Sequence, residues 1–559
     1  MTTKIGPITL PFATKFTLSS LVSAVANLVG QYNFTSASVI TLIFEKEYSD
    51  GVPEWAESAM NSSVFGGAVV GMLTLGYVGD VVGRRRAMAI TLTIMVLSSF
   101  ASCFFVWGNR NTVIIMLSVF RFFMGIGIGG VRELEATAAV TAQPFVPAVG
   151  VAVGPGGRRD RLTYNQSSPP LLSPPPKYLP CQVYPLSAAA SYENDEGSGG
   201  DYGQRLRNVA WAQAWQQPGQ MVPFVVAMCL FGTFYTRYLG SQFRLIMFFG
   251  GMLTVAPLYS LLNKGRKPKP KREPVEGEEE VPESTAISIL GLDGISESEE
   301  EEDGSSSRMS IIDLLGQVGK MNKGKEFAGI CLCWFCSDFY SYGTSMYGPE
   351  LMVRAYEGNL NLVKDYRFNI ISVAATFPTT WLSILAIGRI GTKEFQLLGF
   401  GVNCLLFLLT AMIYSFDTGL TSVAKFSIIV VLRSISRFGA TTSTFVMPSE
   451  LFGAEVRASA TGFAAACGKT GAFISVVITP GLYQQHGVSS MLYLYTCIAA
   501  LGYVLTYYLI PEIDRSDNAA KEAAVKAEVR VNEAKGSSES VPLVGSAVKR
   551  LRSHVKHGN

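Results

Sequence analysis

The sequence predicts an all-α membrane protein whose twelve transmembrane helices form two six-helix bundles. Of its 559 residues, 48% are hydrophobic and 11% aromatic, and the mean hydropathy is +0.27, which is more apolar than a water-soluble core requires. Apolar windows of spanning length, roughly 20 residues each, recur along the chain. One strongly charged segment divides these windows into two groups of six.

Each window is predicted to be a helix, because a helix satisfies its own backbone hydrogen bonds while it crosses a bilayer. The windows cover residues 18–44, 58–80, 87–107, 112–130, 206–236, 241–263, 325–353, 368–388, 395–415, 420–447, 457–482 and 488–510. Basic clusters follow the second and sixth windows (GRRR, 83–86, and KGRKPKPKR, 264–272), whereas the acidic EKEYSDGVPE (45–54) follows the first. Since cytosolic loops are rich in Lys and Arg, we expect both termini in the cytosol. The sequence does not decide between the plasma membrane and an endomembrane.

Four regions are expected along the chain. They are an N-terminal bundle (1–263), a charged cytosolic linker (264–322), a C-terminal bundle (323–512) and a polar cytosolic tail (513–559). The linker contains EPVEGEEE and SESEEEEDGSSS, a composition typical of disordered chains.

One segment, 131–182, interrupts the fourth window and carries nine of the 26 prolines. Joining Gly130 directly to Val183 restores a continuous apolar helix. The segment begins Val-Arg and ends Cys-Gln, which is compatible with intron borders in frame. We interpret it as a retained intron, with a genuine insertion as the alternative.

Several classes of protein are excluded by composition. The net charge of +3 is too small to indicate nucleic-acid binding. Cys331, Cys333 and Cys336 do not converge on one point of a helix, and the chain holds three histidines, so we expect no metal site. No GxxxxGK[ST] motif and no pair of nucleophile and base stands out, so we expect neither an enzyme nor a cofactor.

The stretch CWFCSDFYSYG (333–343) places three chemically active side chains inside an apolar window. Trp334, Asp338 and Tyr342 are four residues apart and therefore share one helix face. An acid at that depth is costly and indicates a functional site. In the alternative interpretation, the aromatic rings pack between helices and Asp338 pairs with a neighbouring base.

A second motif, GYVGDVVGRRR (76–86), joins the second and third windows. It contains Asp80, Gly83, Arg84 and Arg85, and it resembles the signature loop of the major facilitator superfamily. A degraded copy, GRIGTKEFQLLGF (388–400), stands at the matching place in the second half. The resemblance implies a transporter with twelve helices in two bundles around a site near the bilayer midplane.

Further stretches resemble the phosphate:proton symporter branch of that superfamily and cover most of both bundles. They are RFFMGIGIGG with YPLSA, CWFCSDFYSYG, FGATTSTFVMPSELFGAEVRASATGFAAACGKTGA (438–472) and PE (511–512). The resemblance implies that the protein carries phosphate by alternating access. It implies binding residues at Tyr184, Gln216, Trp334, Asp338 and Tyr342, with Gln217 as the alternative to Gln216.

A phosphate monoanion still carries protons, so a carboxylate in its site is reasonable. Asp338 can accept a hydrogen bond from a phosphate hydroxyl, while the indole and phenol groups donate to the phosphate oxygens. Asp338 could also take up a proton itself.

The chain departs from the family pattern where protons are handled. Asn33, Thr91 and Val183 stand where the family has acids, and Thr441 stands where it has an asparagine. We expect Thr441 to remain a substrate ligand. The missing acids favour an exchanger or a uniporter, with proton symport through Asp338 alone as the alternative.

Arg121, Arg433 and Arg437 are among the arginines that lie within predicted spans. Arg433 and Arg437, one helical turn apart, could clamp phosphate, Arg437 could pair with Asp338, or both could face an aqueous vestibule. Arg121 is expected to lock helices together, although the first-span acid that it would meet is missing.

The expected partners are therefore the lipid bilayer and a small anion, with or without protons, and no nucleic acid. Two alternatives remain open: transport of another solute such as a sugar or carboxylate, and a non-transporting phosphate sensor of the same fold. The sequence does not predict an oligomeric state.

Overall fold

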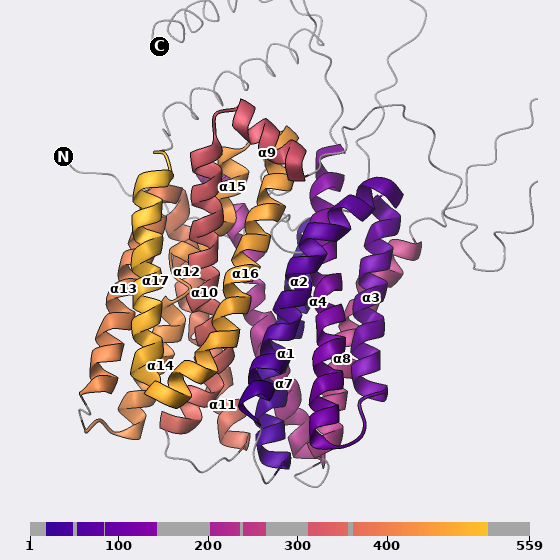
Figure 1. Ribbon diagram of the computed structural model, residues 1–559, viewed down its shortest axis with the longest axis vertical. Helices are drawn as coiled ribbons and strands as arrows, with labels where there is room; N and C mark the ends of the chain where they lie inside the picture. Colours follow the sequence, from indigo (N-terminus) through magenta and orange to yellow (C-terminus); the bar gives the residue numbers. More distant parts are fainter. Residues whose placement is uncertain are drawn as a thin grey trace, which may run out of the picture.

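The computed structural model describes residues 18–48, 53–82, 84–141, 202–234, 239–263, 311–355, 362–416 and 419–512. The described residues form helices and connecting turns, without strands. Helices α1 to α8 gather in one bundle and helices α10 to α17 in a second bundle beside it (Figure 1). The predicted fold class is therefore confirmed.

The N-terminal bundle contains the first six predicted spans. Its helices are α1 (Leu18–Glu47), α2 (Glu54–Val82), α3 (Arg84–Phe104), α4 (Arg110–Thr141), α6 (Tyr202–Ala214), α7 (Gln216–Phe234) and α8 (Leu239–Asn263). The fifth span is broken into α6 and α7 at Trp215. Pro218 follows three residues later, and a proline ring clashes with the carbonyl four residues before it, which explains the break.

The C-terminal bundle contains the other six spans. Its helices are α10 (Gly324–Ala355), α11 (Leu362–Ala374), α12 (Thr376–Ile390), α13 (Thr392–Ser415), α14 (Ser422–Ile435), α15 (Ala440–Leu451), α16 (Ala454–His486) and α17 (Val488–Leu509). The break at Ala375 again precedes a proline, Pro378, by three residues. Between α14 and α15, Gly439 adopts a φ of 72°, which a residue with a side chain rarely tolerates.

Eight described segments are long and apolar enough to cross a membrane. Helices α1, α7 and α10 are not among them because of their polar residues, and α14 and α15 are too short, at 14 and 12 residues. Polar residues in membrane helices are rare unless they face the protein interior or a cavity. Helices α1, α7 and α10 are therefore the place to look for a site.

Part of the predicted linker was assigned wrongly, because helix α9 (Ile311–Lys320) lies within 264–322. Leu314 and Val318, one turn apart, are both buried, and α9 packs on α10 and α16. That i, i+4 apolar pair, directly after a polar run, is the signal of a short amphipathic helix. Residues 264–310 and the tail 513–559 lie outside the described residues.

The proline-rich segment is described only at its start. Helix α4 runs on to Thr141, past the Gly130 boundary expected from sequence, and residues 142–201 lie outside the described residues. The predicted junction at Val183 and the candidate ligand Tyr184 therefore stay predictions.

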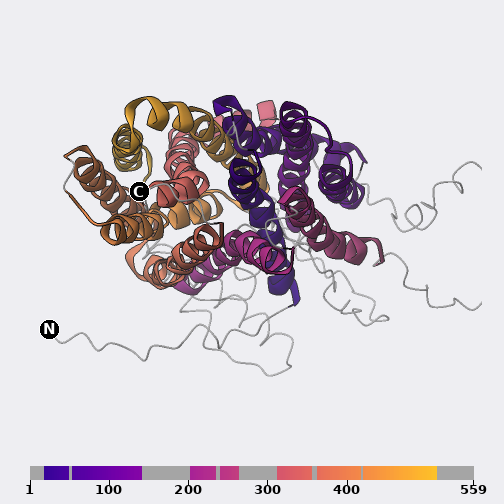
Figure 2. The same ribbon diagram turned by 90° about the horizontal axis from the view of Figure 1, so that it is seen from below.

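The two bundles meet along several helices, as the end-on view shows (Figure 2). At one end, the Tyr483 hydroxyl of α16 donates to the Glu57 carboxylate of α2 at 3.1 Å. Towards the opposite end, the rings of Trp211 on α6 and Trp381 on α12 lie 5.9 Å apart. Contacts between the bundles on both sides of the centre enclose the residues between them.

Candidate functional site

A buried ion pair lies at the centre of the protein. Lys469 Nζ on α16 donates to Asp338 Oδ2 on α10 at 2.6 Å, and the two side chains are 0% and 2% exposed. Each charge neutralises the other, which offsets much of the cost of removing both from water. The packing interpretation of CWFCSDFYSYG expected a base beside Asp338. Whether the pair can also bind a ligand depends on the residues around it.

Aromatic rings from both bundles surround the ammonium group. Lys469 Nζ lies 4.0 Å from the centre of the Tyr342 ring and 5.7 Å from that of Phe34. Tyr342 also packs edge-on against Phe34 and Phe65 of the N-terminal bundle. The ion pair thus sits where the two bundles meet, and cation–π attraction holds Lys469 in place.

Tyr342 links the bundles by a hydrogen bond as well. Its hydroxyl donates to Gln31 Oε1 on α1 at 3.4 Å. Gln31 Nε2 is buried and has no hydrogen-bond partner. A buried donor without an acceptor is rare in proteins and suggests a missing ligand or water.

Trp334 lies one helical turn before Asp338 on α10, and its ring packs against α16. A Cβ placed on Gly468 of α16 would lie 2.4 Å from Cδ1 of its indole ring, so this helix contact requires glycine. The ring also lies edge-on to Phe445 at 6.4 Å. Trp334 is thus a packing residue in this conformation, although it adjoins Asp338 on α10.

The two candidate glutamines of α7 have different surroundings. Gln217 Oε1 accepts a hydrogen bond from Thr376 Oγ1 of α12 at 2.8 Å. Gln216 is 2% exposed, and its Nε2 has no hydrogen-bond partner. Gln216 is therefore the one of these two glutamines with a donor to spare, and its role as a ligand stays a prediction.

Thr441 joins three helices. Its Oγ1 lies 3.3 Å from the hydroxyls of Ser337 and Ser341 on α10, and its carbonyl accepts from Gln213 Nε2 of α6 at 2.9 Å. A hydroxyl at this position holds the start of α15 against α10.

Arg433 and Arg437 are both buried, at 4% and 8% exposure. Arg433 Nη1 donates to Asn369 Oδ1 at 3.1 Å, and Arg437 Nη2 donates to Ser345 Oγ at 3.4 Å. The base that pairs with Asp338 is thus Lys469, in place of the Arg437 that the sequence allowed. Burial also excludes the open vestibule in this conformation.

The two guanidinium groups line a cavity, hereafter the arginine cavity. It contains about 200 Å³ of space that protein atoms do not fill. Polar side chains form its wall: Arg433, Arg437, Gln220, Ser341, Thr344, Ser345, Thr376 and Ser436.

Arg121 donates to oxygens of the N-terminal bundle that carry no charge. Its Nε donates to the Met60 carbonyl at 3.1 Å, and its Nη2 donates to the Asn33 carbonyl at the same distance. Its Nη1 donates to Ser36 Oγ at 3.0 Å. Carbonyls of α1 and α2 therefore replace the missing first-span acid.

The signature loop is as short as its motif suggests. Helix α2 ends at Val82 and α3 begins at Arg84. Gly83 lies outside the described residues, and the side chains of Asp80, Arg84 and Arg85 are not described, so their roles stay predictions.

Sequence analysis missed Lys469 and Gln31. Lys469 lies within the predicted span 457–482, and the rule that selected Asp338, an ionisable group in a membrane helix, applies equally to it. Gln31 carries no comparable signal, because uncharged polar residues are frequent in α1.

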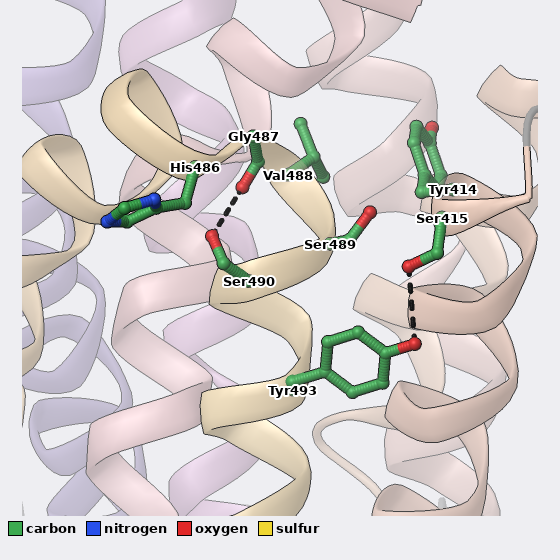
Figure 3. Close-up of a pocket in the computed structure, with 8 residues that line it drawn as sticks. All are labelled: Tyr414, Ser415, His486, Gly487, Val488, Ser489, Ser490 and Tyr493. Carbon is green, nitrogen blue, oxygen red and sulfur yellow. Dashed lines mark hydrogen bonds between the residues drawn. The ribbon is translucent and has the colours of Figure 1, made fainter.

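A larger hollow lies away from this centre, where α13, α16 and α17 begin or end (Figure 3). Its wall includes His486, Ser490 and Tyr493, and the Tyr493 and Ser415 hydroxyls pair with each other at 3.2 Å. It lacks a fixed cation. Among the described residues, no cluster of three His, Cys, Asp or Glu side chains could hold a metal ion.

Comparison with known proteins finds a transporter family and phosphate transporters. The family model described as "Sugar (and other) transporter" matches residues 19–137 and 292–517. Inorganic phosphate transporter PT2 of Toxoplasma gondii is 25% identical over 89% of this chain and 72% of its own length. Inorganic phosphate transporter PHO84 of Saccharomyces cerevisiae is 24% identical over 81% of this chain and 73% of its own length.

Solved structures give the same fold. A D-xylose-proton symporter superposes with a TM-score of 0.57 at 15% identity, covering 88% of this chain and 97% of that one. A partially occluded, inward-open conformation of the xylose transporter XylE from E. coli gives 0.56 at 13% identity, covering 88% and 99%. At these identities the likeness shows the fold alone.

Proposed function

Because the chain belongs to the sugar (and other) transporter family, we propose that it carries inorganic phosphate, or a small phosphorylated solute, across a membrane by alternating access. The resemblance to the major facilitator superfamily is confirmed by the family match and the structural neighbours. The observation that carries the proposal is the Asp338–Lys469 pair, buried where the two bundles meet.

Phosphate can bind both members of this pair, because it can accept a hydrogen bond from one and donate a hydrogen bond to the other. Its negative oxygen accepts from Lys469, and its hydroxyl donates to Asp338. Without phosphate, the two side chains neutralise each other, so the empty protein holds no uncompensated charge at this point. Both the empty and the loaded carrier can therefore close around the centre, as alternating access requires.

Two glutamine side chains of the N-terminal bundle have N–H groups that could donate to an anion. Gln31 Nε2 and Gln216 Nε2 are buried donors without partners, and they come from the N-terminal bundle. Asp338, Lys469 and Tyr342 come from the C-terminal bundle. An anion held by both groups would draw the bundles together.

Coupling to protons has little support in the described residues. Between Leu18 and Phe44, helix α1 contains no acid, and Thr91 is a threonine that donates to the Met88 carbonyl. Exchange or uniport is therefore favoured, and symport through Asp338 is the alternative.

The charges argue against a sugar as the substrate. A neutral sugar would leave the buried Arg433, whose described partner is the Asn369 amide oxygen, without a matching anionic group, whereas phosphate supplies one. The sensor alternative predicts saturable binding without flux.

The test is countertransport of [32P]phosphate by the purified full chain in proteoliposomes. We expect uptake that internal phosphate accelerates, that is strongly reduced in Asp338→Asn and that is unchanged in Cys336→Ala, a buried neighbour on the same helix. Equal uptake in both variants would refute the site. Xylose uptake without phosphate uptake would refute the substrate, and phosphate binding without flux would indicate a sensor.

A further inference from the structure

The arginine cavity adjoins the Asp338–Lys469 centre along α10. Its wall includes Ser341, three residues after Asp338, and Ser345, seven residues after it. Ser345 contacts Arg437 and lies about 10 Å from Asp338 along the helix axis at 1.5 Å per residue. The two places share one helix but have different charged groups.

Arg433 brings to this cavity a positive charge that no carboxylate of the described residues pairs with. Its described hydrogen-bond partner is the neutral Asn369 amide oxygen. Arg433 is only 4% exposed. A guanidinium buried at membrane depth is costly without a matching anion.

The irregular backbone between α14 and α15 also indicates a site at the arginine cavity. The sequence forms no regular helix between Ile435 and Ala440, although this stretch interrupts a predicted span. Irregular backbone at membrane depth occurs where it is buried in protein or lines a cavity, and Ser436 and Arg437 from this stretch do line the cavity. Broken helices of this kind form ion and substrate sites in other transporters.

From the cavity, its two arginines and the broken helix, we infer that Arg433 and Arg437 form a second site, which binds a small tetrahedral oxyanion. The inference deepens the proposed function and relies on it only for naming phosphate as the physiological anion. Sulfate has the same shape and would enter the same site.

The cavity chemistry fits that ligand. Two guanidinium forks and the Gln220 amide can donate, and hydroxyls of Ser341 and Ser345 can rotate to donate or accept. Of the cavity space of about 200 Å³, only about 10 Å³ is open to the centre of a water-sized sphere, which is roughly what one water molecule needs. In this conformation the cavity therefore excludes a sugar or a nucleotide, and an inorganic oxyanion enters it only as the surrounding side chains move apart.

The two sites should distinguish phosphate from sulfate. Asp338 needs a ligand that can donate a hydrogen bond, which phosphate provides and sulfate at neutral pH does not. The arginine cavity carries no carboxylate on its wall and makes no such demand. Sulfate is therefore a probe for the arginine cavity alone.

The experiment measures binding of [35S]sulfate to the purified full chain at fixed ionic strength with chloride as the background anion. We expect Arg433→Gln with Arg437→Gln to weaken sulfate binding by about tenfold or more. Arg367→Gln is the matched control, because Arg367 lies on α11 with an exposed side chain and does not line the cavity.

A second variant covers the case in which the double substitution does not fold. Arg437→Lys keeps the charge and loses the fork, so sulfate binding should fall while the elution volume of the purified protein stays the same. Wild-type protein should also unfold at a higher temperature in sulfate than in chloride. Equal sulfate affinity in wild type and both cavity variants would overturn the inference.

Failure of this site differs from failure of the proposed function. If the protein exchanges phosphate but binds sulfate equally well in wild type and in the cavity variants, the second site is refuted and the transport function is kept. If sulfate binding depends on both arginines but the wild type moves no phosphate, the second site is kept and the transport function is refuted.

Discussion

Lys469 and Asp338 form an ion pair that is 131 residues apart in sequence and 2.6 Å apart in space. It joins α10 to α16 inside the C-terminal bundle, at the surface that this bundle presents to Phe34 and Phe65. The pair therefore has two separable roles, one in holding the fold and one in meeting an anion.

Removing one member of the pair should destabilise the protein more than removing both charges. Asp338→Asn or Lys469→Gln alone leaves a buried charge unpaired, which costs about 3–5 kcal/mol. The double variant should recover most of the thermal stability in detergent and still fail to take up phosphate. Wild-type uptake by the double variant would mean that the pair is only structural.

Tyr342 should act mainly through its ring. Tyr342→Phe keeps the cation–π contact and loses a long hydrogen bond of 3.4 Å, so we expect little change in the KM for phosphate. Tyr342→Leu loses the ring beside Lys469, and we expect KM to rise about 2- to 30-fold. If both variants raise KM equally, the hydroxyl is the important group.

Gly468 should be needed for the position of Trp334. Gly468→Ala places a methyl group 2.4 Å from the indole ring, so the ring must move and uptake should fall. Gly481→Ala on the same helix is the matched control, because a Cβ there meets no atom within 4 Å. Equal uptake by both variants would show that the Trp334 position does not matter for transport.

Arg121 should affect the amount of folded protein and leave substrate affinity unchanged. Arg121→Lys loses the fork that reaches α1 and α2 together, and we expect less folded protein with an unaltered KM. Arg244→Lys is the control, because Arg244 also donates to two carbonyls, of Gly240 and Val106, but is only partly buried. A raised KM in Arg121→Lys with normal folding would place Arg121 in the site.

The sequence predicted the spans well, because length and apolar content decide whether a segment can cross a membrane. It did not predict the breaks at Trp215 and Ala375, since a hydropathy window averages over a proline. It missed helix α9, because the two buried side chains Leu314 and Val318 are too few to change the composition of a charged linker.

The site was predicted in part. Asp338 and Arg437 stood out as ionisable groups in apolar spans, which one sequence can show. Their partners could not be read from it: Lys469 meets Asp338 only because α10 packs on α16, and that pairing of helices is a property of the folded bundle. Whether these residues bind substrate is a prediction for the variants above.

Transport should be independent of a proton gradient. Among the described residues, the central acid Asp338 is held by Lys469, and α1 offers no acid between Leu18 and Phe44. With the same pH on both sides of the vesicle membrane, so that the ionisation of phosphate is constant, a protonophore should leave [32P]phosphate exchange unchanged. An inside-alkaline step should likewise drive no accumulation in vesicles without internal phosphate. Accumulation that the protonophore abolishes would instead require Asp338 to leave Lys469 and carry the proton, and Asp338→Asn should then abolish accumulation.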